Sequence, residues 1–451
     1  MSSPETLRVA VIGSGPAGIY TADALTRQNR EHVAVDVLDR LPTPYGLVRY
    51  GVAPDHTKIK GVARALRTVL EHPRVRFLGG VEYGRHVGLE DLRSAYHAVV
   101  FATGAPTDRR MGVPGEDLPG SVAATDFVNW YCGHPDSEVE RFLLDSEEVA
   151  VIGAGNVALD VARMLAKSAD ELRATDVPQP MLDVLAASKV RRISVVARRG
   201  PLHAKFTAPE LRDIGELANA DTLVDPAEVA IDPNGEEMLG AARAARTNLR
   251  YLKEWAERSP AGRPREVRFR FWRRPVRLNG AERVQSLTVE RTVLDADGRV
   301  QGTGETEEIP AGMVFRSIGY QGLPLPDLPF DADGATVPHE EGRVVDAAGE
   351  RLAGAYVAGW IKRGATGVIG TNKSDAAATV RSLLEDADRL REGGGPREDP
   401  DALLERSGAE VNDYEGWLAI DAAEAALADR LGRGDRVKLL GWDEFRRAAR
   451  G

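Results

Sequence analysis

The sequence predicts an α/β fold with two doubly wound, Rossmann-like domains, one inserted into the other, and three observations support this prediction. The chain has 451 residues, enough for two or three domains with sizeable cores. A short apolar run, a glycine-rich turn and a helical stretch occur in this order twice, near residue 10 and near residue 150. Two further apolar runs, at 98–105 and 313–320, end in small residues and mark where the chain leaves one domain and returns.

The composition excludes several classes of protein. A formal net charge of −10 disfavours nucleic acid and anionic membranes, so any basic partner site must be local. The single cysteine, Cys132, excludes an intramolecular disulfide, a CxxC redox pair and an iron–sulfur cluster held by this chain alone, and we predict no metal site. No apolar run reaches the roughly 18 residues of a membrane span. A strand pattern starts almost at the N-terminus and leaves no room for a signal peptide, so we expect a cytoplasmic protein.

The first glycine turn is Gly13-x-Gly15-x-x-Gly18, between the apolar run 7–12 and a helical stretch. Such glycines allow a sharp turn and a close approach of a diphosphate to the backbone, and the helix N-terminus then offers free N–H groups. Asp39 ends the next predicted strand, where it can accept hydrogen bonds from an adenosine ribose. The pattern predicts a dinucleotide site, and a structural turn that binds nothing is the alternative.

The second glycine turn is Gly153-x-Gly155-x-x-Ala158. Where a ribose-binding acid is expected after the following strand, the chain carries Arg198 and Arg199. Paired guanidinium groups can grip a 2′-phosphate that an acid would repel. The second cofactor is therefore predicted to be NADP(H), with a solvated basic turn as the alternative.

Two other segments have unusual compositions. The loop 42–56 is rich in glycine, proline and aromatic residues, which predicts special backbone angles, and it ends on His56. A lone histidine is more often structural than catalytic. The segment 360–373 joins a strand to a helix whose first turn carries no acid, so its N–H groups can face a carbonyl that gains charge on reduction, as in a flavin. An ordinary strand–helix turn is the alternative.

Taken together, the motifs make the chain resemble adrenodoxin reductase and its bacterial ferredoxin–NADP reductase relatives, from about residue 7 to about residue 385. The blocks that carry the resemblance are, in order, GSGPAG, PTPYGLVRYGVAPDH, FATGA, GAGNVALDVAR, ARRGPL, TAPELRD and GWIKRGATGVIGTNK. The resemblance implies a flavoprotein with disulfide-reductase-like architecture that lacks the redox cysteines. NADPH would pass a hydride to N5 of a non-covalent FAD, and single electrons would go to a ferredoxin-type iron–sulfur protein. The FAD domain would comprise 1–104 and 320–451, including a C-terminal helical tail, and the NADP domain 105–319.

The resemblance also implies site residues. FAD would contact Gly13, Gly15, Ala17, Gly18, Asp39, Leu47, Val81, Trp360, Gly367, Val368 and Ile369. NADP would contact Gly155, Asn156, Val157, Ala158, Arg198 and Arg199, with Glu210 and Gly367 near the nicotinamide. His56 and Asp160 match family residues near the flavin and are the candidate catalytic residues. Asp39 departs from the glutamate of many members, although a shorter carboxylate should still reach a ribose.

Two arginine-rich stretches are candidates for docking an acidic ferredoxin, because a local positive surface would steer an acidic partner. The run 263–277 has seven arginines and one acid, and the segments 267–278 and 283–294 are expected to form antiparallel strands. Strand alternation would put Arg268 and Arg270 on one face of the first. The second candidate is a set of cations at helical spacing, which the resemblance favours: Arg243, Arg246, Arg250 and Lys253. A solvated charged face is the alternative for either stretch.

The two dinucleotide motifs alone leave other functions open. A flavin monooxygenase or diaphorase would also bind FAD and NADPH, and so would a non-catalytic sensor. The motifs do not identify the particular ferredoxin, the direction of electron flow, the oligomeric state or the role of the tail after residue 393.

Overall fold

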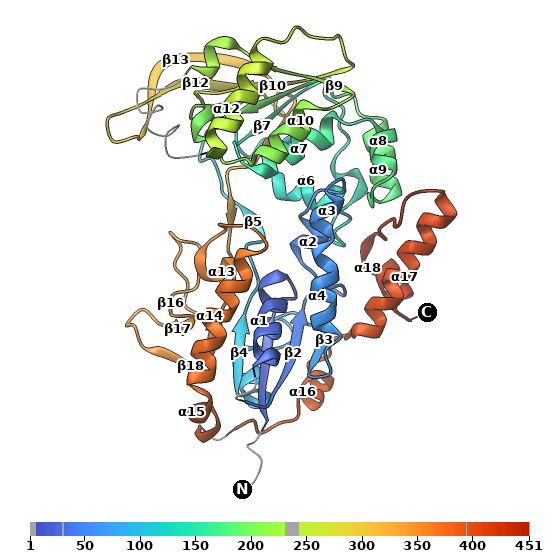
Figure 1. Cartoon of the computed structure of the whole chain (residues 1–451), viewed down its shortest axis with the longest axis vertical. Helices are drawn as coiled ribbons and strands as arrows, with labels where there is room; N and C mark the ends of the chain where they lie inside the picture. The colour runs from blue at the N-terminus through green and yellow to red at the C-terminus, as the bar shows by residue number, and fades with distance from the viewer. Residues whose placement is uncertain (1–5, 29–30, 231–242, 394, 451) are drawn as a thin grey trace. The chain divides into compact units, whose positions relative to one another are not determined.

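The computed structural model describes residues 6–28, 31–230, 243–393 and 395–450, and the chain divides into two compact units (Figure 1). Unit 1 comprises Met1–Thr107, Cys132–Asp136 and Tyr320–Gly451, and unit 2 comprises Asp108–Tyr131 and Ser137–Gly319. Residues 105–107 and 132–136, which the predicted ranges put in the NADP domain, group with unit 1. Two short strands, β5 (Thr107–Asp108) and β15 (Tyr320–Gln321), lie where the chain passes from one unit to the other.

Unit 1 is built on a seven-stranded sheet in the order β16–β17–β18–β4–β1–β2–β3. The strands are β1 (Leu7–Ile12), β2 (Val33–Asp39), β3 (Val75–Gly79), β4 (Ala98–Phe101), β16 (His339–Glu340), β17 (Arg343–Val345) and β18 (Arg351–Val357). The five from β18 to β3 are parallel, whereas β16 and β17 pair antiparallel. The strand order reverses at β1, which has β2 on one side and β4 on the other, and ligands bind doubly wound sheets at such a point.

Strand β1 is buried on both faces, which explains its nearly continuous apolar run. Val9 and Val11 belong to one hydrophobic cluster and Ala10 and Ile12 to another, because successive side chains point to opposite faces. Helices α1 and α14 pack against each other (Figure 1). The described helices of unit 1 are α1 (Pro16–Arg27), α2 (Leu47–Tyr50), α3 (Thr57–Lys60), α4 (Val62–Leu70), α5 (Leu89–Ala95), α13 (Trp360–Arg363), α14 (Thr371–Glu385), α15 (Ala387–Glu392), α16 (Pro400–Ser407), α17 (Tyr414–Leu431) and α18 (Gly441–Arg450).

Unit 2 contains a six-stranded parallel sheet in the order β6–β14–β7–β8–β10–β9 and a three-stranded antiparallel sheet. The parallel strands are β6 (Ser121–Ala123), β7 (Glu148–Ile152), β8 (Arg192–Val196), β9 (Ala220–Val224), β10 (Arg265–Arg270) and β14 (Met313–Arg316), and the antiparallel ones are β11 (Arg273–Asn279), β12 (Ser286–Leu294) and β13 (Val300–Pro310). The described α-helices are α6 (Ala124–Tyr131), α7 (Asn156–Ala166), α8 (Ala169–Arg173), α9 (Gln179–Ala186), α10 (Ala208–Gly215) and α12 (Arg243–Ala256). Among the helices described in either unit, none has the length and hydropathy of a membrane span.

The prediction of one antiparallel strand over 267–278 was wrong. Its first part belongs to β10, which lies between β8 and β9 in the parallel sheet, and only β11 pairs antiparallel with β12. The break falls at Trp272, whose φ of +57° turns the chain out of the first sheet. The alternating pattern continues through this turn, so it could not reveal that the run is divided between two sheets.

Candidate functional site

The first glycine turn of unit 1 needs glycine at two positions because backbone atoms lie where a side chain would begin. At Gly13, where φ is +108°, a Cβ would lie 2.5 Å from the Ala102 carbonyl oxygen, and at Gly18 it would lie 1.8 Å from the Gly13 oxygen. Gly15 differs, because a Cβ there would meet only the Gly46 Cα, at 3.9 Å. The outer glycines therefore set the path of the turn, and the middle one leaves open space at the N-terminus of α1.

Asp39 supports this turn directly. Its Oδ2 accepts hydrogen bonds from the backbone N–H of Ser14 (2.7 Å) and from the Ser14 hydroxyl (2.6 Å), and its Oδ1 accepts from the Leu41 N–H (2.9 Å). Burial raises the pKa of the Asp39 carboxyl, although these hydrogen bonds oppose the rise. A carboxylate can accept about four hydrogen bonds, so room remains for a ribose hydroxyl. Sequence reasoning missed the role of Ser14, whose hydroxyl beside the fingerprint glycines was the available signal.

The loop 42–56 lies against the same turn and has the special backbone angles that its composition predicts. Tyr45 and Gly46 both have positive φ, at 83° and 49°. The Tyr45 N–H donates to the Ser14 carbonyl (3.0 Å), and a Cβ at Gly46 would lie 2.9 Å from the Gly15 Cα. Leu47, half-buried, begins α2 directly after this contact. The loop thus packs beside the open space in front of Gly15.

A buried ion pair ties this loop to the C-terminal tail. Arg49 and Glu424 of α17 form two hydrogen bonds, one of them 3.0 Å between Nη1 and Oε2, and both side chains are almost fully buried. The Lys438 ammonium donates to the carbonyl oxygens of Arg49 (2.6 Å) and Cys132 (2.9 Å). The tail, to which sequence analysis assigned no role, therefore holds the loop in place. Nothing in the tail's own pattern signals this.

The segment after β18 forms an exposed turn before α14. Val368 at its tip has 67% of its surface exposed, and its N–H donates to the Thr371 hydroxyl (3.1 Å). The first turn of α14 carries no acidic residue. The Trp360 indole N–H donates to the Thr366 carbonyl (3.1 Å), which fixes the ring beside the turn.

All predicted FAD residues lie in unit 1, at or beyond the carboxyl ends of parallel strands. The Gly13–Gly18 turn follows β1, Asp39 ends β2 and Val81 follows β3, with its N–H donating to the Asp39 carbonyl (2.9 Å). Ala17 is buried beneath Gly359, where a Cβ would lie 2.5 Å from the Ala17 Cβ. Because the ends of parallel strands share one edge of a sheet, the fold brings these residues to the same edge.

The second glycine turn, in unit 2, has the same plan with looser packing. At Gly153, where φ is +144°, a Cβ would lie 2.1 Å from the Ser317 oxygen, so this glycine is required. A Cβ at Gly155 would have no atom within 4 Å, which leaves open space before Asn156 and Val157 at the start of α7. The third position accommodates the methyl group of Ala158, which is fully buried. The Asn156 Oδ1 accepts from the Thr207 N–H (2.8 Å).

The strand register of the two units shows that Arg198 and Arg199 do not stand at the position that corresponds to Asp39, where the sequence analysis put them. The Gly13 N–H donates to the Leu38 carbonyl, and the Gly153 N–H donates to that of Val196, so Leu38 and Val196 correspond. The counterpart of Asp39 is therefore Ala197, and Arg198 and Arg199 come one and two residues later. Arg198 is exposed, and the Nε of half-buried Arg199 is buried without a hydrogen-bond acceptor. Among the described residues, no carboxylate forms an ion pair with either guanidinium.

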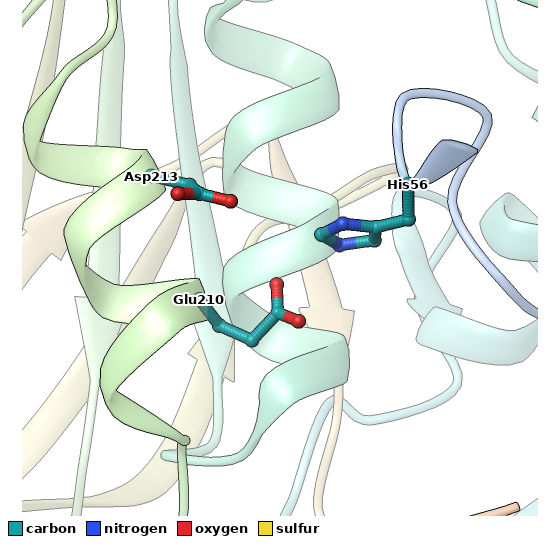
Figure 2. A group of neighbouring side chains, drawn as sticks. All are labelled: His56, Glu210 and Asp213. Atoms are coloured by element: carbon teal, nitrogen blue, oxygen red, sulfur yellow. The ribbon is translucent and has the colours of Figure 1, made fainter. Parts of the chain in front are cut away.

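Two predicted acidic residues share one guanidinium inside unit 2. The Arg163 side chain, 1% exposed, reaches Asp160 Oδ1 from Nη2 (2.7 Å) and Glu210 Oε2 from Nη1 (3.6 Å). Sequence reasoning missed Arg163, whose spacing of three residues from Asp160 on a helix was the available signal. Figure 2 shows Glu210 and Asp213 leaving the same side of α10. His56, drawn in the same figure, belongs to unit 1, where it is half-buried and directly precedes α3.

Both arginine-rich stretches expose cations. On α12, Asn248, Leu249, Leu252 and Trp255 are buried. The cations that share the opposite, exposed face are Arg243, Arg246, Arg250 and Lys253. In the other stretch, Arg268 pairs with Glu266 (2.8 Å), and Arg270 and Arg273 lie 4.0 and 3.7 Å from the buried Glu228. On α12, Arg250 lies 3.7 Å from Glu254. Acidic residues therefore lie beside cations in both stretches, and the preference for α12 stays a prediction from the resemblance.

Comparison with known proteins found a family, two named reductases and a solved structure that are similar to this chain. Residues 7–214 match the pyridine nucleotide-disulphide oxidoreductase family. NADPH-ferredoxin reductase FprA of Mycobacterium tuberculosis is 41% identical over 460 residues, which cover 98% of this chain and 99% of that protein. The mitochondrial NADPH:adrenodoxin oxidoreductase of Arabidopsis thaliana is 37% identical, with 99% and 96% covered. A solved structure of the M. tuberculosis FprA in complex with NADPH matches with a TM-score of 0.92 at 40% identity, covering 99% of this chain and 100% of that one.

Proposed function

Because the chain belongs to the pyridine nucleotide-disulphide oxidoreductase family and, within it, to the NADPH–ferredoxin and adrenodoxin reductases, we propose that it carries electrons from NADPH through FAD to a ferredoxin-type iron–sulfur protein. It is an FAD-dependent ferredoxin–NADP reductase, and the family predicted from the sequence blocks is confirmed. The single observation that carries this conclusion is the similarity to named reductases along the whole chain. It favours this function over the monooxygenase, diaphorase and sensor that the two glycine turns alone left open.

Unit 1 is the proposed FAD site, and its residues fit that cofactor. The open space in front of Gly15 lies at the N-terminus of α1, where free N–H groups would hold the diphosphate. Asp39 has remaining acceptor capacity for the ribose. The Gly367–Ile369 turn and the acid-free start of α14 would face the flavin ring. Bound FAD supplies the redox chemistry, since it accepts two electrons with a hydride and releases them singly.

Unit 2 is the proposed NADPH site. The start of α7, with open space at Gly155, would hold the diphosphate, and Arg198 and Arg199 would grip the 2′-phosphate because no described carboxylate neutralises them. Glu210 would lie near the nicotinamide. Glu210 and Asp160 both form ion pairs with the buried Arg163, and they would act through their fixed charge and position.

His56 and Asp160 are proposed as residues of the flavin environment. Neither is assigned a proton-transfer step, because hydride transfer between two cofactors requires no side-chain nucleophile. A cytoplasmic location stays a prediction.

The partner is proposed to be an acidic ferredoxin that docks on the exposed cations of α12. The chain as a whole is acidic, so the local arginines must prevail at short range. Exposed charges are screened beyond a Debye length of about 8 Å at physiological ionic strength. Ferredoxin-dependent reduction of a cytochrome should therefore fall as salt rises above about 0.2 M, whereas reduction of a small neutral acceptor should change little.

Stopped-flow bleaching of the flavin by NADPH, followed by reduction of a panel of ferredoxins, tests this function. In the variant Arg246→Glu, Arg250→Glu the KM for ferredoxin should rise several-fold while NADPH–ferricyanide activity persists. The matched control is Arg268→Glu, Arg277→Glu, which makes the same charge change on the partly exposed Arg268 and the exposed Arg277 of the other stretch. An equal rise in the KM for ferredoxin in both variants would contradict the proposal that α12 is the docking surface. Failure of every ferredoxin to accept electrons would overturn the proposed function.

A further inference from the structure

The main chain of the arginine turn, Ala197–Arg199, is held by a neighbouring segment. Each of its three carbonyl oxygens accepts a hydrogen bond from the β10–β11 turn, Arg270–Arg273, or from β12. The bonds run from Arg273 N–H to Ala197 O (2.9 Å), from the Thr292 hydroxyl to Arg198 O (2.8 Å) and from Trp272 N–H to Arg199 O (3.4 Å). The Ala197 N–H in turn donates to the Arg270 carbonyl (2.8 Å). The position of the arginines is therefore set from outside the turn that carries them.

Trp272 contributes its side chain as well as its backbone. Its φ of +57° is unusual for a bulky residue, which indicates that the surroundings impose this conformation. The indole lies directly on Gly200, where a Cβ would be 2.1 Å from the Trp272 Cζ2 and 2.5 Å from its Cε2. Gly200 itself has an ordinary conformation, with φ −73° and ψ 173°, so the indole rather than the backbone requires a glycine there. The ring thus limits the residue that follows the two arginines.

A buried acid fixes the β10–β11 turn from behind. The Glu228 Oε2 accepts from the Phe271 N–H (2.8 Å), and its Oε1 faces the guanidinium groups of Arg270 (4.0 Å) and Arg273 (3.7 Å). Glu228 is 5% exposed. The residue before Trp272 is therefore anchored inside unit 2, which gives the indole a firm base.

We propose that Trp272 is a positioning residue that sets the preference for NADPH over NADH. Packed on Gly200 and bonded to the arginine turn, it holds the main chain from which Arg198 and Arg199 extend. A guanidinium on a fixed backbone loses less entropy on binding a phosphate than one on a mobile loop. This inference rests on the proposed NADP site of unit 2 and adds the element that orients it.

The first test is Gly200→Ala, because the Trp272 indole leaves no room for the added methyl group. We expect the KM for NADPH to rise about tenfold relative to that for NADH, as for the loss of one charge-assisted contact, with kcat little changed. Binding of 2′,5′-ADP, measured by calorimetry, should weaken by about the same factor, whereas binding of ADP should not change. This second measurement reports the 2′-phosphate site independently of turnover.

A second variant separates the indole from the backbone. Asparagine tolerates the left-handed conformation, so Trp272→Asn removes the ring without straining the turn. It should reduce the preference for NADPH by itself. In the double variant the methyl group at position 200 finds space, so Gly200→Ala should add no further loss, and this non-additivity measures the coupling of the two residues. Should Gly200→Ala fail to fold, Trp272→Asn alone decides, since an unchanged cofactor preference would overturn the inference.

Unit 2 offers a matched control in Gly215→Ala. A Cβ at Gly215 would lie 2.3 Å from the Trp255 Cζ2, so the same clash of a methyl group with an indole arises at the end of α10. This variant should lower the melting temperature and change the KM for both cofactors in equal proportion. If Gly200→Ala behaves in the same way, Trp272 serves only the fold. A wild-type enzyme without preference for NADPH would overturn the NADP site and this inference together. An intact preference without ferredoxin reduction would contradict only the assigned partner.

Discussion

In unit 1, β2 ends on Asp39, whose carboxylate binds Ser14 and so closes the glycine turn from within, whereas in unit 2 the corresponding residue is Ala197, which has no such group. Unit 2 supports its turn from outside instead, through the hydrogen bonds and the indole of the β10–β11 turn. The comparison shows that one motif can be stabilised in two ways. Where the acid is absent, the space beside the turn is available to a phosphate and its arginines.

The third position of the motif shows a second difference. Gly18 has a carbonyl oxygen 1.8 Å from where its Cβ would be, while Ala158 carries a methyl group in the same place. The helix α1 thus lies closer to its glycine turn than α7 does. An identical spacing of residues conceals this difference in packing. The following predictions test the two differences between the units.

The largest effect is expected from Gly18→Ala. The new methyl group would collide with backbone that cannot move aside, and we expect a destabilisation of about 3 kcal/mol or more together with loss of FAD. Visible flavin absorbance per protein and thermal unfolding measure the two effects. A variant purified with a full complement of FAD would show that α1 can move away as α7 has done.

Next in size is the effect of replacing Arg198 and Arg199 with alanine. Each charge-assisted contact to the 2′-phosphate is worth about 1.5–3 kcal/mol, so the kcat/KM for NADPH should fall by about 10²-fold or more. The value for NADH should change little, because NADH has no 2′-phosphate. Steady-state kinetics with both cofactors provides the comparison. Equal losses would mean that the arginines serve the fold of unit 2.

A pH effect of intermediate size is expected from Glu228, which anchors the outside support of unit 2. Burial raises the pKa of its carboxyl to about 7, above the ordinary value of 4.5. The folded protein therefore holds this proton more tightly than the unfolded chain. The contribution of Glu228 to stability is complete below about pH 4.5 and is lost as the pH rises through about 7, amounting to roughly 3 kcal/mol.

Glu228→Gln should remove this dependence, because the amide oxygen still accepts from Phe271 and no charge is buried. Denaturant unfolding at several pH values between about 5 and about 8 measures the effect. The variant should be more stable than the wild type at the upper end of this range. The free energy of unfolding of the wild type could instead rise with pH in this window, with Glu228→Gln removing the rise. That result would mean that attraction to Arg270 and Arg273 outweighs the cost of burying the Glu228 carboxylate.

The smallest effect is expected from Ala158→Gly, the reverse of the substitution in unit 1. Glycine in a helix costs about 0.5–1 kcal/mol relative to alanine, and nothing else should change. NADPH binding should persist, and thermal unfolding should shift by a few degrees at most. A loss as large as that of Gly18→Ala would show that the methyl group of Ala158 is itself part of the cofactor site.

Local patterns in the sequence determined the two dinucleotide folds, their cofactors and the family. Strand, glycine turn and helix are consecutive in the chain, so Gly13–Gly18, Gly153–Ala158 and the paired arginines could be interpreted without knowledge of the fold. The relatives confirm the family and its function. The proposed contacts of individual site residues stay predictions.

Only the tertiary structure decided how these motifs are supported. It divided the run 267–278 between two sheets, identified Ala197 as the counterpart of Asp39 and packed Trp272 on Gly200. It also paired Arg49 with Glu424, 375 residues apart. Register and burial depend on which distant segments share a sheet or a core, because a side chain's partners are set by three-dimensional packing. A local pattern of residue types carries no record of that packing.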